Sequence, residues 1–369
     1  MTSSDLYPVS RVSAVQEAAA KAGLDALLLT PGPDLRYVSG YEAKPSERLT
    51  CLVVPAAGAA YLMVPRLELP SAQASPAARL GLEFVAWDET DDPYALAAAR
   101  LGKPAKVGLA DRMWAMASLS FRAALPGAEQ VLAGSVLREL RMRKSPAEVA
   151  ALREAGEAID SVHRRVPELL RAGRTEREVA ADLAEAIRAA GHKTVDFVIV
   201  ASGPSGASPH HDVSDRVIQA GDPVVVDIGG TFPSGYCSDS TRTYCVGEPP
   251  AEFAAYYEVL RQAQDAACAA VRPGVSCESV DAAARDLIAG AGYGGYFVHR
   301  TGHGIGMETH EEPYIVSGNG EPMEPGFAFS VEPGIYLPGR HGARIEDILV
   351  CTETGGERLN NTSRELVIV

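Results

Sequence analysis

The sequence has no surplus of basic residues and no long apolar run. Its 34 Lys and Arg stand against 48 Asp and Glu, so the formal net charge is −14. A nucleic-acid surface needs a basic patch, so this balance argues against a nucleic-acid partner. The apolar runs fall far short of the ~20 residues that span a bilayer, and residues 1–5 have no basic segment leading into an apolar one. We expect neither a membrane partner nor a secretory leader.

Cysteine is scarce and unpatterned. The six cysteines are scattered along the chain and form no C-x-x-C pair. This spacing argues against a zinc ribbon and against a disulfide framework. The expected compartment is therefore the reducing cytoplasm.

The first part of the chain alternates short apolar segments with helical ones. Its 369 residues suggest about two domains at roughly 150 residues each, and 46% apolar with 22% charged residues is typical of a globular protein. Strands separated by helices predict an α/β layer domain. The expected strands cover 26–30, 50–54, 60–64, 82–87 and 106–109, and the expected helices cover 12–22, 67–80, 94–101 and 114–124.

A long helix is predicted to begin at Pro146. Ser145 precedes this proline and Glu148 follows it, which is a typical helix start. No Gly/Ser-rich linker marks a domain boundary nearby. We expect an N-terminal α/β domain over residues 1–135 and a second domain over residues 136–369.

The second part contains an internal repeat. Residues 146–154 and 250–258 are identical at six of nine positions, and a Gly–Gly spacing of 18 follows in both copies. Ala-rich amphipathic helices can look alike without being related, which is the plainer interpretation. The alternative is a duplicated helix–helix–strand unit with a pseudo-twofold axis. It predicts strands at 197–201 and 296–299, and a site that draws ligands from both halves.

Acidic residues stand in apolar strand-like segments of this second part. They are Asp227 and Asp239, which a hairpin would bring side by side, and Glu332 and Glu346 further along. A buried acid is costly unless it is paired or bound to a metal ion. A salt bridge would explain one such residue, but four of them together with a glycine-flanked His303 are harder to explain that way. Four carboxylates balance two divalent ions, and oxygen ligands with one imidazole favour Mn²⁺ or Co²⁺ over a structural zinc.

These five residues, in this order, resemble the ligands of the M24 metallopeptidases, the family of prolidase, aminopeptidase P and methionine aminopeptidase. The resemblance rests on Asp-x-Thr-Arg-Thr, Gly-His-Gly-Ile-Gly, Val-Glu-Pro-Gly-Ile-Tyr and Arg-Ile-Glu-Asp segments. It implies an α+β pseudo-twofold "pita-bread" catalytic domain. It also implies that Asp227 binds one ion, that Asp239 and Glu346 bridge both, and that His303 and Glu332 complete the second. Glu332 would accept the proton of the attacking water.

The prolidase and aminopeptidase P branch fits best, because it places histidines where His210, His299 and His310 lie. In this branch these histidines serve the substrate carbonyl and charge stabilisation. The resemblance gives Arg344 and Thr241 the role of orienting the metal ligands.

The branch implies two divalent ions per subunit, with Mn²⁺ expected and Co²⁺ or Zn²⁺ as alternatives. It implies a cytoplasmic homodimer that hydrolyses Xaa-Pro dipeptides. Proline has no amide N–H and a fixed backbone angle, so general peptidases fit such bonds poorly. The alternative activity is that of an aminopeptidase P on longer Xaa-Pro peptides. More remote alternatives are a non-catalytic pita-bread binding module and a metal-free, creatinase-type hydrolase, and the five intact ligand positions argue against both.

The substrate-binding end departs from the pattern of the branch. Several dipeptidases carry an arginine after His-Glu-x-Pro that clamps the free carboxylate of the substrate, and here that position is Tyr314. We therefore expect Tyr314 at the substrate site, and a clamp from Arg36, Arg48 or Arg340.

Overall fold

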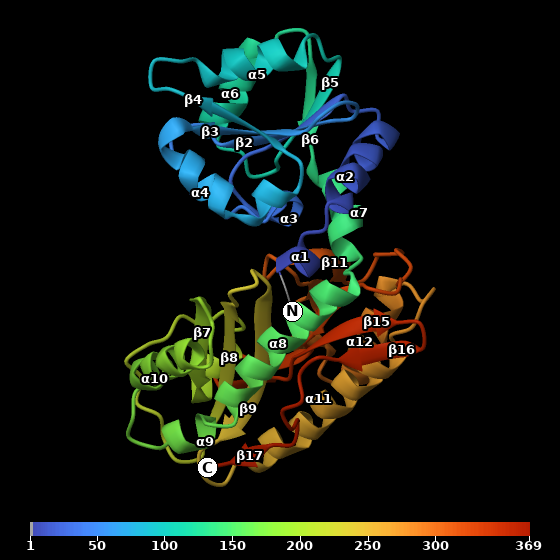
Figure 1. Cartoon of the computed structure of the whole chain (residues 1–369). Helices are drawn as coiled ribbons and strands as arrows, with labels where there is room; N and C mark the ends of the chain where they lie inside the picture. The colour runs from blue at the N-terminus through green and yellow to red at the C-terminus, as the bar shows by residue number, and fades with distance from the viewer. Residues whose placement is uncertain (1–2) are drawn as a thin grey trace. The chain divides into compact units, whose positions relative to one another are not determined.

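The chain divides after Arg141 in the computed structural model, which describes residues 3–369 (Figure 1). One unit extends to Arg141 and the other runs from Met142 to Val369. The boundary expected after residue 135 falls inside helix α7 (Gly134–Met142). Within residues 3–369, no helix is long and apolar enough to cross a membrane.

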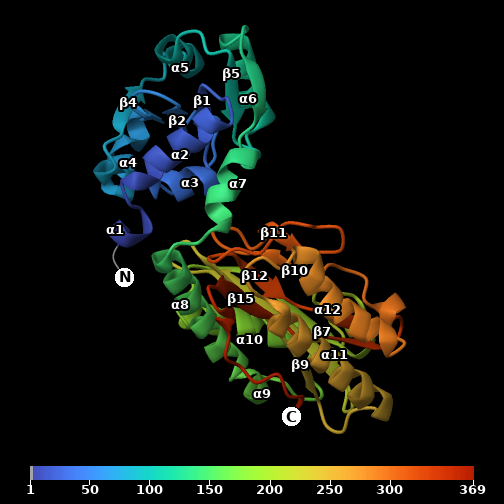
Figure 2. The same cartoon turned by 90° about the vertical axis from the view of Figure 1, so that its right-hand side faces the viewer.

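The first unit is built on a six-stranded sheet with strand order β4-β3-β2-β1-β5-β6. Strand β2 is antiparallel to both of its neighbours, and the other pairs are parallel. Helices α5 and α6 cover one face, and α3 and α4 lie on the other (Figures 1 and 2). The strands are β1 (Ala26–Leu29), β2 (Cys51–Pro55), β3 (Tyr61–Pro65), β4 (Glu83–Trp87), β5 (Lys106–Leu109) and β6 (Glu129–Leu132). The helices are α1 (Ser3–Leu6), α2 (Ser10–Lys21), α3 (Pro33–Ser39), α4 (Leu69–Ala74), α5 (Pro93–Leu101) and α6 (Ala115–Ala124).

The five strands expected here are present, but the helix expected over 67–80 is broken. Helix α4 ends at Ala74, and a short 3₁₀ turn begins at Pro76. Ser75 between them is extended, because a residue before proline avoids the helical region. The sequence analysis also missed β6, α3 and α7, which are short elements.

The second unit contains two copies of one arrangement, a pair of helices packed on a sheet. Helices α8 (Pro146–His163) and α10 (Glu176–Ala189) pack on one sheet, and α11 (Ala251–Ala270) and α12 (Cys277–Gly290) pack on another (Figure 1). Thr175 and Ser276 cap α10 and α12 through their side chains, at matching places of the repeat. A further short helix, α9 (Val166–Leu169), lies between α8 and α10 in the chain.

The two sheets carry the strands that matter for the site. The first has order β17-β9-β8-β7 and the second β11-β10-β12-β15-β16, and β13 and β14 form a separate pair. The first sheet holds β7 (Thr194–Ser202), β8 (Pro223–Thr231), β9 (Cys237–Cys245) and β17 (Val367–Ile368). The other strands are β10 (Gly302–Gly304), β11 (Glu311–Ile315), β12 (Ala328–Val331), β13 (Gly334–Leu337), β14 (His341–Arg344), β15 (Asp347–Thr352) and β16 (Gly355–Arg358).

The strand expected over 296–299 is absent, and this prediction was wrong. The segment begins with a 3₁₀ turn, Gly294–Tyr296, and continues without regular structure. The guanidinium of Arg285 donates hydrogen bonds to the carbonyl oxygens of Phe297 and His299, at 3.2 and 2.8 Å. A side chain thus takes the place of a neighbouring strand. The other expected strand lies within β7.

Arg242 on β9 joins distant parts of the second unit from a buried position. It donates to Asp347 Oδ1 at 2.5 Å and to the carbonyl oxygens of Glu346, Thr362 and Ser363. Its side chain is 3% exposed and that of Asp347 is fully buried. A buried charge pair of this kind depends on both partners, since either charge alone would stay desolvated.

We predict that Arg242→Met lowers the free energy of unfolding of the second unit by about 3–5 kcal/mol, because Asp347 loses its buried partner and keeps only the more exposed guanidinium of Arg358, 3.7 Å away. Chemical denaturation followed by circular dichroism measures this loss. The matched control is Arg177→Met, which removes an exposed ion pair with Asp215 and should leave stability nearly unchanged. Equal effects of the two substitutions would contradict the assignment.

Candidate metal centre

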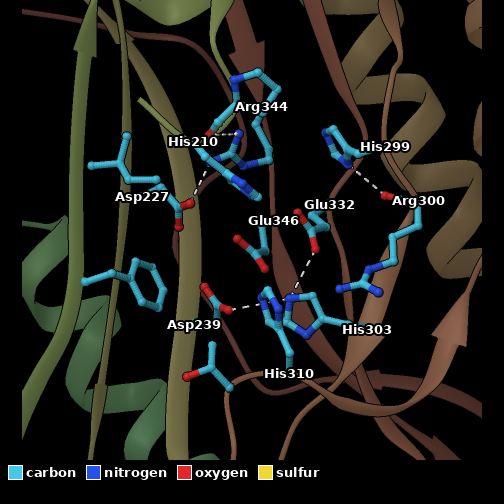
Figure 3. A pocket seen from close by; sticks show the side chains of 14 residues that line it. His210, Asp227, Asp239, His299, Arg300, His303, His310, Glu332, Arg344 and Glu346 are labelled. Carbon is cyan, nitrogen blue, oxygen red and sulfur yellow. Dashed lines mark hydrogen bonds and ion pairs between the residues drawn. The ribbon is translucent and has the colours of Figure 1, made fainter. Parts of the chain in front are cut away.

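A cavity in the second unit gathers most of the residues singled out by the sequence. Its volume is about 640 Å³, within the range of small-molecule sites. Both sheets contribute to its wall (Figure 3). Nine of the expected site residues line it: His210, Asp227, Asp239, His299, His303, His310, Glu332, Arg344 and Glu346.

Strands β8 and β9 place two aspartates on one face of their sheet. Asp227 is paired with Thr241 across the strands, and Asp239 lies two residues before Thr241. Because alternate residues of a strand face the same side, all three side chains point to the cavity face. Asp227 is 7% exposed and Asp239 is 3% exposed.

His303 is fixed between two glycines that allow a very close approach of strands. A Cβ atom at Gly302 would lie 1.8 Å from the carbonyl oxygen of Ser330, and one at Gly304 would lie 2.3 Å from that of Glu312. The strands therefore pack closer than any side chain permits. This close packing of the backbone on both sides of His303 fixes the position of its imidazole at the centre of the site.

The imidazole of His303 has a defined orientation. Its Nδ1 lies 3.1 Å from the carbonyl oxygen of Gly304, which can only accept, so Nδ1 donates. Nε2 then faces Glu332 Oε1 at 3.2 Å and Asp239 Oδ2 at 3.7 Å. The space between these atoms requires a positive charge, which a proton or a metal ion can supply.

Glu346 joins the two sheets at the site. Its backbone N–H donates to the carbonyl oxygen of Thr241 at 3.0 Å, and the Thr241 hydroxyl donates to Glu346 Oε2 at 2.7 Å. Arg344 donates to Asp227 Oδ2 at 2.5 Å and to the hydroxyl of Tyr336 at 2.8 Å. Thr241 and Arg344 thus each donate to one of the clustered carboxylates.

The donor atoms form three overlapping groups, each with all its atoms within 4.8 Å. They are Asp227/Asp239/Glu346, His303/Glu332/Glu346 and Asp239/His303/His310. Burial, followed by the neighbouring carboxylates, raises the pKa of both Asp239 and Glu346 well above their ordinary values. Asp227 Oδ1 is buried and has no hydrogen-bond partner in the described part of the chain. An unpartnered oxygen within a cluster of mutually repelling carboxylates fits hard divalent cations.

The three further histidines differ in their surroundings. His310 packs against His303 with ring centroids 3.9 Å apart, and burial, followed by the charge of His303, lowers the pKa of His310 to about 4. His299 is engaged at both nitrogens, with the carbonyl oxygen of Arg300 at 2.7 Å and the Tyr336 hydroxyl at 2.9 Å. His210 is exposed and lies at the cavity wall (Figure 3).

Two of the residues expected at the substrate end, Tyr314 and Arg340, belong to the second unit and do not line the cavity. Tyr314 does not line it, and its ring lies under the guanidinium of Arg300, 4.3 Å from the carbon of that group. Arg340 is ion-paired with Glu252 and does not line the cavity either. Arg36 and Arg48 belong to the first unit.

Five wall residues were not predicted as site residues. They are Phe197 and Ile199 on β7, Pro209, Arg300 and Thr309. The signal for Arg300 was present, because it opens the segment that carries His303 and His310. The alternation of β7 could not by itself say which of its faces meets the cavity.

Two family models match the sequence. Residues 150–353 match the metallopeptidase family M24, and residues 11–143 match the creatinase/prolidase N-terminal domain. The chain is 57% identical over 360 residues to a probable dipeptidase PepE of Mycobacterium tuberculosis, with 97% of this chain and 96% of that protein covered. It is 34% identical over 365 residues to an Xaa-Pro dipeptidase of Lactobacillus delbrueckii subsp. lactis, with 94% and 95% covered.

A solved structure gives the same result. The dipeptidase PepE from Mycobacterium ulcerans has a TM-score of 0.94 and 55% identity to this chain, with 100% of this chain and 99% of the other covered. The expected fold class, an α/β N-terminal domain with an α+β pita-bread catalytic domain, is confirmed. On this evidence the chain belongs to the metallopeptidase family M24.

Proposed function

We propose that this chain is an Xaa-Pro dipeptidase that works with two divalent metal ions. The observation that carries the proposal is the meeting of five donor side chains from two sheets in one cavity, with a buried carboxylate oxygen left unpartnered. The names of the similar proteins, a probable dipeptidase and an Xaa-Pro dipeptidase, support the reaction class.

Asp227 would hold one ion, His303 and Glu332 would hold a second, and Asp239 and Glu346 would serve both. The overlapping donor groups support this division, because Glu346 belongs to two of the three. Such ions would supply Lewis acidity and would lower the pKa of a bound water. Oxygen-rich ligands with one imidazole favour Mn²⁺, and Co²⁺ and Zn²⁺ are the alternatives.

Glu332 accepts the proton of the attacking water. In the metal-free chain burial opposes its ionisation, but the hydrogen bond and charge of His303 lower the pKa of Glu332 to about 2. A metal ion in place of the His303 proton would also keep Glu332 a carboxylate. His310 is neutral near pH 7, because partial desolvation of its ring at the cavity wall lowers its pKa to about 4, although the residue is otherwise exposed. A neutral imidazole can donate its N–H to the carbonyl oxygen as negative charge develops. His210, exposed at the wall, contacts the substrate carbonyl from the other side.

His299 is a positioning residue in this proposal. Its Nδ1 must donate to the carbonyl oxygen of Arg300, so its Nε2 accepts from Tyr336, whose oxygen accepts from Arg344. No nitrogen remains for the substrate. These hydrogen bonds hold Arg344 in the position from which it donates to Asp227.

The cleaved substrate is a dipeptide in this proposal, and an aminopeptidase P acting on longer peptides is the alternative. A homodimer located in the cytoplasm is part of the proposal and rests on the resemblance alone.

The Mn²⁺-loaded protein should hydrolyse Ala-Pro and Leu-Pro, and a chelator should abolish the activity until Mn²⁺ is restored. The measurement is release of the free N-terminal amino acid under steady-state conditions, with Ala-Ala as the control peptide. Absence of such release with Mn²⁺, Co²⁺ and Zn²⁺ in turn would contradict the proposed function. Faster cleavage of Ala-Pro-Ala than of Ala-Pro would favour the aminopeptidase.

His310→Ala should keep both metal ions and lose turnover by about 10²–10³-fold, with a smaller change in KM, because one donor to the developing negative charge is removed. Elemental analysis beside steady-state kinetics measures both. Glu332→Gln should lose more turnover and some metal, since it serves as ligand and base. The matched control is His211→Ala, whose imidazole pairs with Glu176 and lies off the cavity wall. Metal loss in His310→Ala would make this histidine a ligand.

Asp239→Asn should stabilise the metal-free protein and destabilise the metal-loaded protein. The raised pKa of Asp239 means that its charge destabilises the metal-free fold at a pH above that pKa. The metal-free variant should therefore have a higher Tm than the metal-free wild type at pH 7. The difference should shrink as the pH falls through the raised pKa toward the ordinary 3.8. With Mn²⁺ the wild type should be the more stable protein, and a variant less stable in both states would refute the prediction.

A further inference from the structure

His310 has no hydrogen bond that would fix its imidazole. Within residues 3–369, its ring nitrogens neither donate to nor accept from another group of the chain, and the residue is exposed at the cavity wall. The ring packs against that of His303, with centroids 3.9 Å apart (Figure 3). The position of this imidazole therefore depends on the backbone that carries it. A donor to the scissile carbonyl has to be held by whatever fixes residue 310.

One cross-strand pair stands beside both histidines. Gly304 follows His303, Glu311 follows His310, and Gly304 is paired with Glu311 in the β10–β11 register. Between the two strands, residues 305–310 belong to no helix or strand. The path of that segment, and with it the place of His310, is set where Glu311 begins β11.

The carboxylate of Glu311 is buried and ion-paired. The ammonium of Lys144 donates to Glu311 Oε1 at 2.7 Å, and the two side chains are 1% and 7% exposed. The backbone N–H of Lys144 donates to the carbonyl oxygen of Gly326 at 2.9 Å. The next residue, Ser145, forms the capping box of α8 together with Glu148. The ammonium is thus presented from a backbone that is itself fixed.

The same carboxylate lies against the backbone of Gly306. A Cβ atom at Gly306 would come 2.6 Å from Glu311 Oε1, so a side chain there would displace the carboxylate. The carbonyl oxygen of Gly306 accepts from the backbone N–H of Cys237 at 2.8 Å, at the start of β9. Glu311 therefore lies between Lys144 and this glycine, and it holds the two ends of segment 306–311 together.

Stability alone is a weak reason for a buried Lys–Glu pair. Desolvation of both charges offsets most of their attraction, and apolar side chains of similar size often stabilise a fold as well or better. An ion pair differs from apolar packing in its direction, because the ammonium hydrogen and the carboxylate oxygen must meet within a narrow range of distance and angle. The pair of Lys144 and Glu311 is therefore suited to fixing a backbone position.

We propose that Lys144 and Glu311 form a positioning pair that holds the backbone at residue 310, so that His310 stays against His303 and can donate to the scissile carbonyl. The inference rests on the proposed function, in which His310 is that donor. Neither Lys144 nor Glu311 lines the cavity, so the pair acts through His310 and does not touch the substrate.

Glu311→Gln keeps the shape of the side chain and removes the charge that Lys144 meets. On the full, Mn²⁺-loaded chain, kcat for Ala-Pro should fall on the order of 10- to 100-fold, because a displaced donor no longer reaches the carbonyl oxygen. KM and metal content should change less. A crystal structure of the metal-free variant should show the imidazole of His310 displaced from its 3.9 Å contact with His303.

A double-mutant cycle with His310→Ala shows whether the pair acts through this histidine. With the imidazole already absent, Glu311→Gln should reduce kcat by less than about threefold further, because residues that act as one unit are not additive. A pair that only supports the fold would lower kcat by the same factor in both backgrounds, and that result would overturn the inference.

The double variant Lys144→Met/Glu311→Gln separates placement from stability. It removes both buried charges, so its Tm should return close to that of the wild type and lie above that of Glu311→Gln. Its kcat should stay low, because the directed contact is still absent. This variant also provides the test if Glu311→Gln does not fold. The matched control is Glu324→Gln, which removes an exposed ion pair with Arg143 and should leave kcat unchanged.

The outcomes distinguish this inference from the function on which it rests. An active wild type together with normal kcat in Glu311→Gln would overturn the inference and leave the Xaa-Pro dipeptidase in place. Recovery of kcat along with Tm in the double variant would also overturn it, since the pair would then serve stability alone. An unmoved His310 in the variant crystal structure would do the same. Hydrolysis of no Xaa-Pro substrate by the wild type would contradict the proposed function, and the crystal structure would still test the placement of His310.

Discussion

The second unit is organised around one electrostatic constraint, the burial of four carboxylates that face one another. Asp227, Asp239 and Glu346 are almost fully buried, and Glu332 is only slightly more exposed. Such a cluster is unfavourable in a low-dielectric interior unless cations balance it. Arg344 supplies one positive charge and the polar hydrogens of Thr241 reduce the repulsion further. The remaining charge explains why the site is best understood as a metal centre.

The supports of this cluster are themselves buried and tied to remote parts of the chain. Arg242 reaches the backbone at Glu346 from the opposite side of β9 and also bonds to the Asp347 carboxylate. Asp347 receives a second bond from the Gln264 side chain on α11, at 2.9 Å. The helix layer therefore helps to hold a residue next to Glu346. Catalytic geometry and the stability of the fold depend here on the same few bonds.

The sequence could predict the parts of the site that are recognisable from residue type and spacing. Acids in apolar strands, a glycine-flanked histidine and the spacing of the repeat identified the clustered donor residues and the helix pairs. It could not predict contacts that depend on packing. Over 296–299, where a strand was expected, two carbonyl oxygens accept hydrogen bonds from Arg285 instead of from a neighbouring strand. The guanidinium of Arg300 lies over the ring of Tyr314, which is placed by the pairing of β10 with β11. Both involve a long side chain whose partner is fixed only by the tertiary fold.

The division of donors between the two halves has a consequence for the symmetry of the site. One half supplies two aspartates, and the other supplies a histidine and two glutamates. Two identical units that paired as separate chains would present identical donors, so they could not form this unequal set. The unequal set therefore requires two halves that differ in sequence at the donor positions. The helices and sheets keep a twofold arrangement that the donor side chains do not share.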